Sequence, residues 1–469
     1  MLDFHRARAI DDRFPTMKTV RIGSGLGFYG DSWKPVRASI ARGAVQYIGS
    51  DHLAELTLAI LQKDRARDPS LGYARDMLPM LAELYPLGRD RNVKFVLNAG
   101  GLNPEGGAAA LVASFRKLNL HSKIAVVTGD SVLERIDELA AAGEAFAHLD
   151  TGANISSVRE RLVFASAYLG AAPIVEALEM GADIVLTGRV ADAALFLAPL
   201  VHEFKWGWQD YAKLAQGLTV GHLLECSGQA SGGNFGGDWQ SVPDIAHIGY
   251  PIAEVSEDGS AIITKAPGTG GLVSFDTVRQ QLLYEVHDPR SYFSPDVVLD
   301  MSTLTLTDLG GDRVEVKGAS GKPRPAKLKV VGGYHDGFMG EASLSYSWPD
   351  ALKKAQATAA IVKTLLDEQK TKYDELHVEY LGHNALFGAV AEHDAAEELN
   401  EVFLRMAIRT PERKVAEEFR RKFPWLALSG PPFVTGAGIQ GTSELIGIWP
   451  TLVKRELVES RVKIEMVEV

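Results

Sequence analysis

Short apolar runs that stop at glycine or at a polar residue recur through the first half of the chain. The clearest is Lys94–Leu97, which ends at Asn98-Ala99-Gly100-Gly101. Further runs of this kind lie at 20–22, 45–48, 123–127, 146–149 and 183–186. Between them, apolar residues recur with helical spacing at 52–63, 107–118, 131–142 and 191–200. Strands that alternate with helices in this way predict βαβ units and a parallel sheet.

This pattern predicts an α/β fold for residues 18–225, namely a mainly parallel sheet with flanking helices in a doubly wound arrangement. Periodicity alone leaves an open sheet and a barrel as alternatives. In both architectures the carboxyl ends of parallel strands share one edge, and ligands bind there. The glycine loops that end these strands therefore fall at a ligand-binding edge, which indicates an enzyme.

The pattern changes after residue 225, where glycines become dense and long helical windows become rare. We predict short strands, then a helix, a strand and a second helix, at 296–332, 349–370, 377–380 and 394–408. Residues 226–469 therefore read as an α+β domain with glycine-rich loops, and residues 1–17 as an N-terminal extension. Glycine accounts for 46 of the 469 residues, where roughly 7% is usual. Its clustering indicates tight loops rather than linkers.

Charge and cysteine content narrow the classes of function. A net charge of -11 without a basic cluster argues against nucleic-acid binding and against an anionic membrane surface. A single cysteine, Cys226, excludes an internal disulfide and any site built from several cysteines. No window reaches the roughly 18 apolar residues of a membrane helix, and Met1–Arg6 lacks the apolar core of a secretory signal. We therefore expect a cytoplasmic protein.

The segment from Asn98 to Asn103 is the most specific candidate for ligand binding. Two amide side chains flank the pair Gly100-Gly101 immediately before a predicted helix. Backbone N–H groups and the positive end of a helix dipole suit a carboxylate or a phosphate. We therefore expect Asn98, Gly100, Gly101 and Asn103 to contact a substrate and to stabilise a developing oxyanion. Simple capping of the helix by Asn103 is the alternative.

Three other predicted strand ends carry charged residues. Asp31 follows Gly23-Ser24-Gly25-Leu26-Gly27, whose spacing differs from the G-x-G-x-x-G of dinucleotide-binding proteins, so a nicotinamide or flavin enzyme is disfavoured. Asp31 is either a substrate contact or a solvated turn residue. Asp130 is a candidate catalytic acid. Arg189 suits bidentate binding of a carboxylate, with Asp192 beside it, unless these two residues form an internal ion pair.

The glycine-rich loops of the second half offer further candidates. Ser231 and Asn234 lie in the densest glycine run and are expected to contact the substrate. Cys226 could be a nucleophile, although a lone cysteine is more often a small buried residue. The segment Lys265–Gly271 resembles a phosphate-cradling loop in composition but lacks the P-loop order. We expect Lys265, Gly268, Thr269 and Gly270 to bind the pyrophosphate of coenzyme A.

His335, Asp336 and Glu341 lie among glycines and are the best candidates for general acid and base catalysis, because histidine titrates near neutral pH. The alternative is a hydrogen-bonded loop histidine. No H-E-x-x-H or comparable spacing of metal ligands occurs, so we expect no metal.

Together these motifs resemble the acyclic terpene utilisation family of AtuA-like proteins over roughly residues 18–455. The resemblance is carried by Ile22–Asp31, Leu97–Pro104, Val127–Asp130, Asp183–Asp192 and Cys226–Asp238. It implies a role in the bacterial catabolism of branched or terpenoid acids through coenzyme A thioesters, but it assigns no reaction and no catalytic residues. Many relatives continue into a small domain of ferredoxin-like fold. Because the sequence stops at Val469, we expect a separately encoded small partner of that fold.

Two hypotheses of function follow. In the first, the chain is a lyase without a redox cofactor, a hydratase, dehydratase or C–C lyase that acts on an acyl-CoA or a related carboxylic acid. His335, with Asp336 or Glu341, would transfer protons, and coenzyme A would enter as part of the substrate. In the second, the chain is a non-catalytic acyl-CoA-binding subunit of a larger complex with the small partner. We expect a homo-oligomer in either case.

Overall fold

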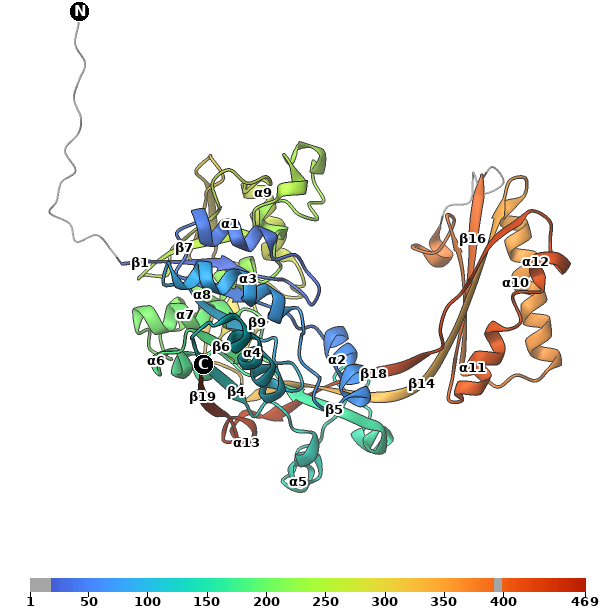
Figure 1. Cartoon of the computed structure of the whole chain (residues 1–469), viewed down its shortest axis with the longest axis horizontal. Coiled ribbons are helices and arrows are strands. Elements are labelled where there is room, and N and C mark those ends of the chain that lie inside the picture. The colour runs from blue at the N-terminus through green and yellow to red at the C-terminus, as the bar shows by residue number, and fades with distance from the viewer. Residues whose placement is uncertain (1–17, 392–398) are drawn as a thin grey trace, which may run out of the picture. The chain divides into compact units, whose positions relative to one another are not determined.

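The computed structural model describes residues 18–391 and 399–469, so the predicted extension at 1–17 lies outside the described residues. The chain forms two compact units. The larger comprises residues 18–157, Phe164–Gly332 and Pro450–Val469, and the smaller comprises Val158–Val163 and Gly333–Trp449. The chain enters the smaller unit within β14 (Lys327–Ser347) and leaves it within β18 (Ser443–Lys454), as can be followed in Figure 1.

The larger unit is built on a mixed sheet. Within the described residues, its ten strands in spatial order are β11 (Thr305–Asp308), β12 (Val314–Lys317), β8 (Ala261–Lys265), β7 (Pro251–Ser256), β1 (Thr19–Ser24), β2 (Tyr47–Ser50), β3 (Lys94–Leu97), β6 (Ile184–Thr187), β4 (Lys123–Thr128) and β19 (Lys463–Glu468). The strands from β1 to β4 in this order pair in parallel, and the flanking strands on both sides pair antiparallel. The path has two separate edges, so the sheet is open.

Helices cover both faces of the parallel strands. One face packs against α1 (Lys34–Arg42), α3 (Met77–Arg89) and α4 (Pro104–Leu118), and the other against α6 (Ala172–Glu179), α7 (Ala194–Phe204) and α8 (Tyr211–Leu224). Adjacent residues of β2 show the two faces, because successive side chains of a strand point in opposite directions. Ile48 packs in the core beneath α3, whereas the ring of Phe196 on α7 occupies the space where Gly49 has no side chain.

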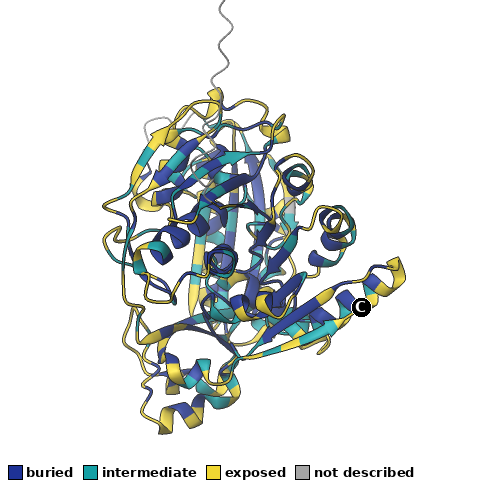
Figure 2. Ribbon diagram, turned by 90° about the vertical axis from the view of Figure 1, so that its left-hand side faces the viewer, coloured by how far each residue is buried: buried dark blue, intermediate teal, exposed yellow. Residues whose placement is uncertain are grey.

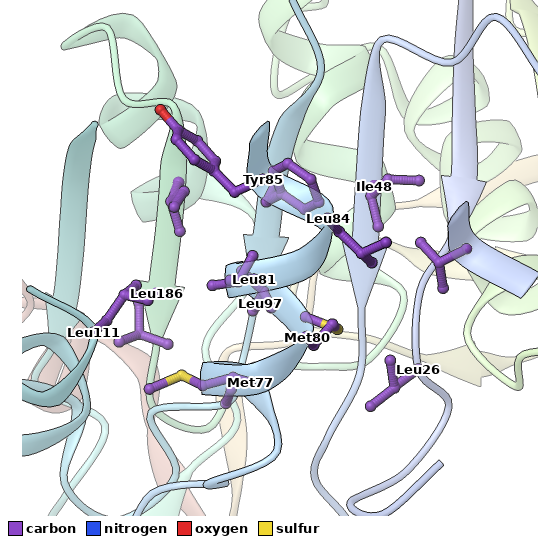
Figure 3. Close-up of a cluster of buried hydrophobic side chains, with 14 of the residues drawn as sticks. Leu26, Ile48, Met77, Met80, Leu81, Leu84, Tyr85, Leu97, Leu111 and Leu186 are labelled. Atoms are coloured by element: carbon purple, nitrogen blue, oxygen red, sulfur yellow. The ribbon is translucent and has the colours of Figure 1, made fainter. Parts of the chain in front are cut away.

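The core beneath α3 shows why these strands read as continuous apolar runs. Met77, Met80, Leu81 and Leu84 project from one side of α3 toward the strands, as Figure 3 shows. Leu97 of β3 and Leu186 of β6 lie in the same cluster and are fully buried. In Figure 2, dark blue is concentrated in the strands and on one side of the helices. Strands buried on both faces need apolar residues at successive positions.

The α/β class predicted for the first half is confirmed, with five parallel strands at the centre of a mixed sheet. The division into units differs from the predicted boundary between residues 225 and 226. Residues 226–332 belong to the larger unit, because β7 pairs with β1 and extends the same sheet. The predicted strand at 146–149 is wrong, since Phe146 adopts a φ of 47°, which an extended strand does not allow.

The smaller unit contains an antiparallel sheet with helices on one face. Its strands pair in the order β15 (Glu375–Leu381), β16 (Glu401–Thr410), β14 and β17 (Val434–Ile439), and α10 (Ala351–Glu368) and α11 (Arg413–Arg420) pack against it. The predicted helix at 394–408 is wrong from residue 401 onward. Val402, Leu404, Met406 and Ile408 are buried at alternate positions, which is the period of a strand. Residues 392–398 of that prediction lie outside the described residues.

Among the described residues, no helix combines the length and the apolar character that crossing a lipid bilayer would take.

Two leucines of α4 provide a matched test of this packing. Leu111 is 0% exposed and Leu118 is 49% exposed. We expect Leu111→Ala to lower the free energy of unfolding by about 2–5 kcal/mol, because it leaves a cavity in the core. Leu118→Ala should change it by less than about 0.5 kcal/mol. Urea titration followed by circular dichroism measures both variants, and equal losses would contradict the described packing of α4.

Candidate functional site

The carboxyl ends of the parallel strands carry a cluster of interacting polar side chains. Asp51 and His52 follow β2, Asn98 follows β3, Asp130 follows β4 and Arg189 follows β6. All five are buried, with at most 5% of their surface exposed. Buried polar groups are stable only when they are hydrogen-bonded or paired. Their partners therefore determine what this edge of the sheet can do.

Asn98 links the ends of two strands. Its side-chain oxygen accepts a hydrogen bond of 2.7 Å from the backbone N–H of His52, and its amide nitrogen donates to Asp51. The imidazole of His52 lies 3.0 Å from the hydroxyl of Ser50 and 3.1 Å from the carboxylate of Asp76. Asn98 is thus at the predicted edge, where it orients neighbouring residues.

The backbone amides of the predicted oxyanion loop are already in use. Gly100 donates to the carbonyl of Thr187 at 3.0 Å, and Gly101 donates to the carbonyl of Asn98 at 3.2 Å. A side chain at Gly100 would meet the Thr187 carbonyl at 2.5 Å, so this position needs glycine. Asn103 accepts from the N–H of Gly106 at 2.9 Å and caps α4. The N–H groups of Gly100 and Gly101 therefore bond to other parts of the protein and not to a ligand. Asn103 caps the helix, which was the alternative weighed for it.

Arg189 is the most buried large side chain of the site. Its guanidinium donates to the carbonyl of Leu53 at 2.8 Å, pairs with Asp192, and lies 4.1 Å above the ring of Tyr168. Its Nε has no hydrogen-bond partner among the described residues. The internal ion pair between Arg189 and Asp192, weighed above as the alternative to substrate binding, is therefore present.

The two aspartates nearest Arg189 differ in environment. The side chain of Asp192 is 36% exposed, whereas Asp51 is buried. Burial and, next, the charge of Asp192 hold the pKa of Asp51 well above its usual range, against the opposing influence of Arg189 and of the hydrogen bond from Asn98. Asp51 therefore favours its neutral form, and Asp192 is the carboxyl group that pairs with the guanidinium of Arg189.

Asp130 supports the turn that carries Arg189. Its carboxylate accepts a hydrogen bond of 3.1 Å from the backbone N–H of Arg189, and a side chain at Gly188 would meet that carboxylate at 2.3 Å. Burial raises the pKa of Asp130 from the ordinary value of 3.8 to about 6. Asp130 thus lies at the predicted edge, beneath the turn.

A cavity of about 590 Å³ opens beside Arg189 and Asp192, wholly within the larger unit. Its wall is largely apolar, with Leu53, Leu149, Leu218, Phe293, Leu328 and Leu452. Its polar and charged lining residues include Glu55, Tyr168, Arg189, Asp192, Glu285, Tyr292, Lys327 and Lys329. We call this cavity the strand-end pocket. Its size and mixed lining are typical of small-molecule sites.

Glu55, Tyr168 and Lys329 form a connected group in the strand-end pocket. The hydroxyl of Tyr168 donates to Glu55 at 2.7 Å, and the Lys329 ammonium lies 2.9 Å from the same carboxylate. Burial by itself raises the pKa of Glu55, but the hydrogen bonds from Tyr168 and Lys329 together outweigh it and bring the pKa to about 2. Glu55 is therefore charged at neutral pH and holds Tyr168 and Lys329 in place.

A second buried pair lies close to the pocket. His222 and Glu225, at the end of α8, are 2.8 Å apart, and the ring of His222 packs against that of Tyr292. Burial raises the pKa of Glu225 to about 7, although His222 opposes this shift. Within the described part of the chain, Nε2 of His222 has no hydrogen-bond partner. Tyr292 connects this pair to the pocket, because its ring contacts His222 and also lines the pocket wall.

Asp31 has an internal partner for each of its oxygens. It accepts hydrogen bonds from the backbone N–H of Gly27 at 3.0 Å and of Ser32 at 2.7 Å, and from the hydroxyl of Tyr250 at 2.8 Å. These contacts fit a turn residue that closes the first glycine loop.

The predicted phosphate-binding loop is closed on itself. Lys265 donates to the carbonyl of Thr269 at 2.9 Å and pairs with Asp312 at 2.9 Å. The N–H of Gly270 donates to the carbonyl of His247 at 2.8 Å. Gly268 has a φ of 71°, so it serves the turn. The charge of Lys265 is thus neutralised within the loop, which disfavours the predicted pyrophosphate site.

Ser231 and Asn234 lie in the larger unit, in the loop after α8. The hydroxyl of Ser231 is buried and lacks a partner in the described structure, while the amide of Asn234 donates to Gln229 at 3.0 Å. Cys226 is next to Glu225. Burial and the charge of Glu225 raise the pKa of its thiol, which disfavours a role as nucleophile.

His335, Asp336 and Glu341 lie on β14 in the smaller unit, and each forms ion pairs there. His335 lies 3.1 Å from Glu444, and Asp336 lies 3.4 Å from Arg409. Glu341 accepts two hydrogen bonds of 2.9 Å from Arg405. The three residues thus lie along one strand, and each pairs with a different residue of the smaller unit.

The sequence-based interpretation missed several residues of the polar cluster at the strand ends and of the strand-end pocket. Asp51 and His52 directly follow a strand that was predicted, so their position at its carboxyl end could have identified them as site residues. Glu55, Tyr168, Tyr292 and Lys329 come from four separate segments, and no local pattern marks them. Only tertiary structure brings such residues together.

The family model described as "Acyclic terpene utilisation family protein AtuA" matches residues 20–464. No curated protein and no solved structure matches significantly.

The raised pKa of Asp130 predicts a pH effect on stability. The carboxyl group binds its proton more tightly in the folded chain than in the unfolded chain. Its contribution to the free energy of unfolding is therefore present below a pH of about 4, and it is lost as the pH rises to about 6. Asp130→Asn keeps an acceptor for the backbone N–H of Arg189 but cannot ionise. We therefore expect the free energy of unfolding of this variant to fall by up to about 3 kcal/mol less than that of the wild type over the same pH range. Urea unfolding across this pH range measures the difference.

The exposed Asp90→Asn is the matched control for Asp130→Asn and should leave the pH profile of the wild type unchanged. A profile that is the same for all three proteins would contradict the buried environment of Asp130.

Proposed function

The chain belongs to the acyclic terpene utilisation AtuA family, and we propose that it is a catabolic enzyme whose active site is the strand-end pocket. Its substrate is a branched-chain or terpenoid acyl-CoA or a related carboxylic acid. The observation that carries this proposal is an apolar cavity at the carboxyl ends of parallel strands, in which the partly exposed carboxylate of Asp192 is held by Arg189.

The lining of the strand-end pocket supports this class of substrate. Leucine and phenylalanine side chains cover most of the wall, and burying a branched hydrocarbon against them is favourable by roughly 25 cal/mol per Å². The polar groups suit a carbonyl or carboxyl group at one end of the molecule. Such a division between an apolar wall and a few placed polar groups sets the orientation of a ligand.

Proton transfer at the carbon beside a carbonyl is the chemistry that these groups favour. Asp192 would remove that proton, and the electron pair of the C–H bond would pass to the carbonyl oxygen as an enolate. Burial raises the pKa of Tyr292, so its hydroxyl keeps its proton and can donate to that oxygen. The electron pair of the enolate would then return to form a C=C bond as the C–O bond to the hydroxyl on the next carbon breaks. The proton that Asp192 had taken would pass to the departing hydroxide, so that water leaves and the dehydration is complete. Hydration is the reverse, so the proposed class is a hydro-lyase, or a C–C lyase that uses the same enolate.

A solvent-exchange experiment tests the proposal without knowledge of the full reaction. The purified protein is incubated in deuterium oxide with straight-chain and methyl-branched acyl-CoA thioesters, and mass spectrometry follows deuterium at the carbon beside the carbonyl. We expect exchange into branched substrates. Asp192→Asn should slow the exchange at least about a hundredfold, which is typical for loss of a general base. Asp90→Asn is the surface control and should exchange at the wild-type rate.

His335, on β14 of the smaller unit, remains a second candidate for proton transfer. His335→Ala, measured in the same assay, separates the two possibilities. If His335→Ala is inactive and Asp192→Asn retains full exchange, the proton-transfer role passes from Asp192 to His335.

The alternative function is a non-catalytic acyl-CoA-binding subunit that acts with a small ferredoxin-fold partner. One observation favours it, because the backbone amides of residues 100–103 already donate to carbonyl groups of the protein, which disfavours an oxyanion hole in this loop. A protein whose melting temperature rises with a branched acyl-CoA, but which never exchanges deuterium by itself, would support this function over catalysis.

A further inference from the structure

Four cations lie within eight residues beside the strand-end pocket. Lys322, Arg324, Lys327 and Lys329 occur without an intervening acidic residue, in a chain whose net charge is -11. We call residues 322–329 the basic segment. All four side chains are exposed. A local excess of positive charge in an acidic protein indicates an anionic ligand.

The basic segment forms part of the pocket itself. Pro325, Lys327, Leu328 and Lys329 line the strand-end pocket. Lys322 lies on the neighbouring sheet of β9 (Tyr292–Phe293), β10 (Val298–Asp300) and β13 (Ser320–Lys322). There it is in register with Phe293 of the pocket wall, because both residues pair with Val298. Lys322 therefore lies two strands away from a residue of the pocket wall, and Lys327 and Lys329 lie in the wall itself.

The backbone of the basic segment is held in place. The backbone N–H of Arg455 donates to the carbonyl of Ala326 at 3.1 Å, and its Nε donates to the carbonyl of Pro325 at 3.1 Å. Two prolines, Pro323 and Pro325, restrict the backbone further. A fixed backbone lowers the entropy cost of ordering the segment around a ligand.

Not all of this charge is balanced by acidic neighbours. Lys329 pairs with Glu55 at 2.9 Å, and Arg324 lies 3.9 Å from Glu459, which Arg455 shares. The pKa of Asp300 is lowered mainly by hydrogen bonds from Ser302, and the charge of Lys322 contributes to this shift. Neither Lys322 nor Lys327 forms an ion pair with any described residue. These two lysines are therefore the available cations.

We propose that the basic segment binds the phosphate groups of an acyl thioester carrier, so that the substrate of the strand-end pocket is a phosphate-bearing thioester and not a free acid. This inference rests on the proposed function, because it takes the acyl group to lie in the pocket. Lysine ammonium groups bind phosphate through charge-assisted hydrogen bonds. The basic segment would bind the phosphates that were first assigned to Lys265, since Asp312 neutralises that lysine.

A pair of ligands with the same acyl group isolates the phosphates. Acyl-CoA carries them, whereas the corresponding acyl-pantetheine has the same thioester and arm without them. Titration calorimetry at low and high salt measures both. We expect acyl-CoA to bind more tightly at low salt, and the double variant Lys322→Glu/Lys327→Glu to weaken its binding by at least about tenfold. The affinity for acyl-pantetheine should stay within about twofold.

The double variant Lys117→Glu/Lys317→Glu changes the net charge equally at exposed sites outside the segment and should bind as the wild type does. Lys322→Gln/Lys327→Gln provides a milder substitution, and circular dichroism confirms that each variant is folded. Equal affinity of the wild type for both ligands, unchanged by the variants, would overturn the phosphate site and leave the proposed function standing.

Adenosine bisphosphate alone, titrated into the same proteins, separates the two proposals. Adenosine bisphosphate could bind in a way that requires the two lysines, while neither thioester binds more tightly than adenosine bisphosphate does. In that case the basic segment is a phosphate site, but the proposed acyl substrate is wrong. If neither adenosine bisphosphate nor either thioester binds, both proposals are overturned.

Discussion

The buried guanidinium of Arg189 is the interaction on which the strand-end site depends. A charge removed from water costs several kcal/mol unless it is paired and hydrogen-bonded. Arg189 meets this cost through Asp192, the carbonyl of Leu53 and the ring of Tyr168, which follow three different strands or loops. The backbone N–H of the same residue is held by Asp130. One residue thereby ties β2, β4 and β6 together at the edge where ligands bind in α/β proteins.

The same guanidinium determines how protons are distributed among its neighbours. Two carboxyl groups share one cation, and only Asp192 reaches the cavity. Asp51 is buried, which raises its pKa and favours its neutral form, so that Asp192 is left as the partner that balances the charge of Arg189. A single exposed carboxylate beside an apolar wall is a more defined proton acceptor than two competing ones. The burial of Asp51 is therefore part of how the site is arranged, and Asn98 maintains it by its hydrogen bonds to Asp51 and His52.

The sequence predicts the strands that carry the site better than it predicts the contacts of the site residues. Runs such as 94–97 are apolar because parallel strands are buried on both faces, and that constraint is local. The function of Gly100 is not local, because its amide bonds to Thr187 of another strand. For the same reason, the loop of Asn98 was located correctly while its donors were assigned to a ligand. The segment at 401–408 was misassigned because Phe403 and Ala407 place apolar residues between Val402, Leu404, Met406 and Ile408, which hides the alternation that is typical of a strand.

Net charge is a poor guide to what such a protein binds. An excess of 11 negative charges over the whole chain argued against nucleic acid and against an anionic membrane surface. That total conceals the local group of Lys322, Arg324, Lys327 and Lys329. Charges on the surface act over about a Debye length, roughly 8–10 Å, so distant acidic residues do not cancel a cation at a pocket wall. What matters is whether each cation has an acidic neighbour. Lys265 has one in Asp312, and Lys327 has none among the described residues. The local pairing of charges therefore distinguishes a lysine that stabilises its own loop from a lysine that is available to a ligand.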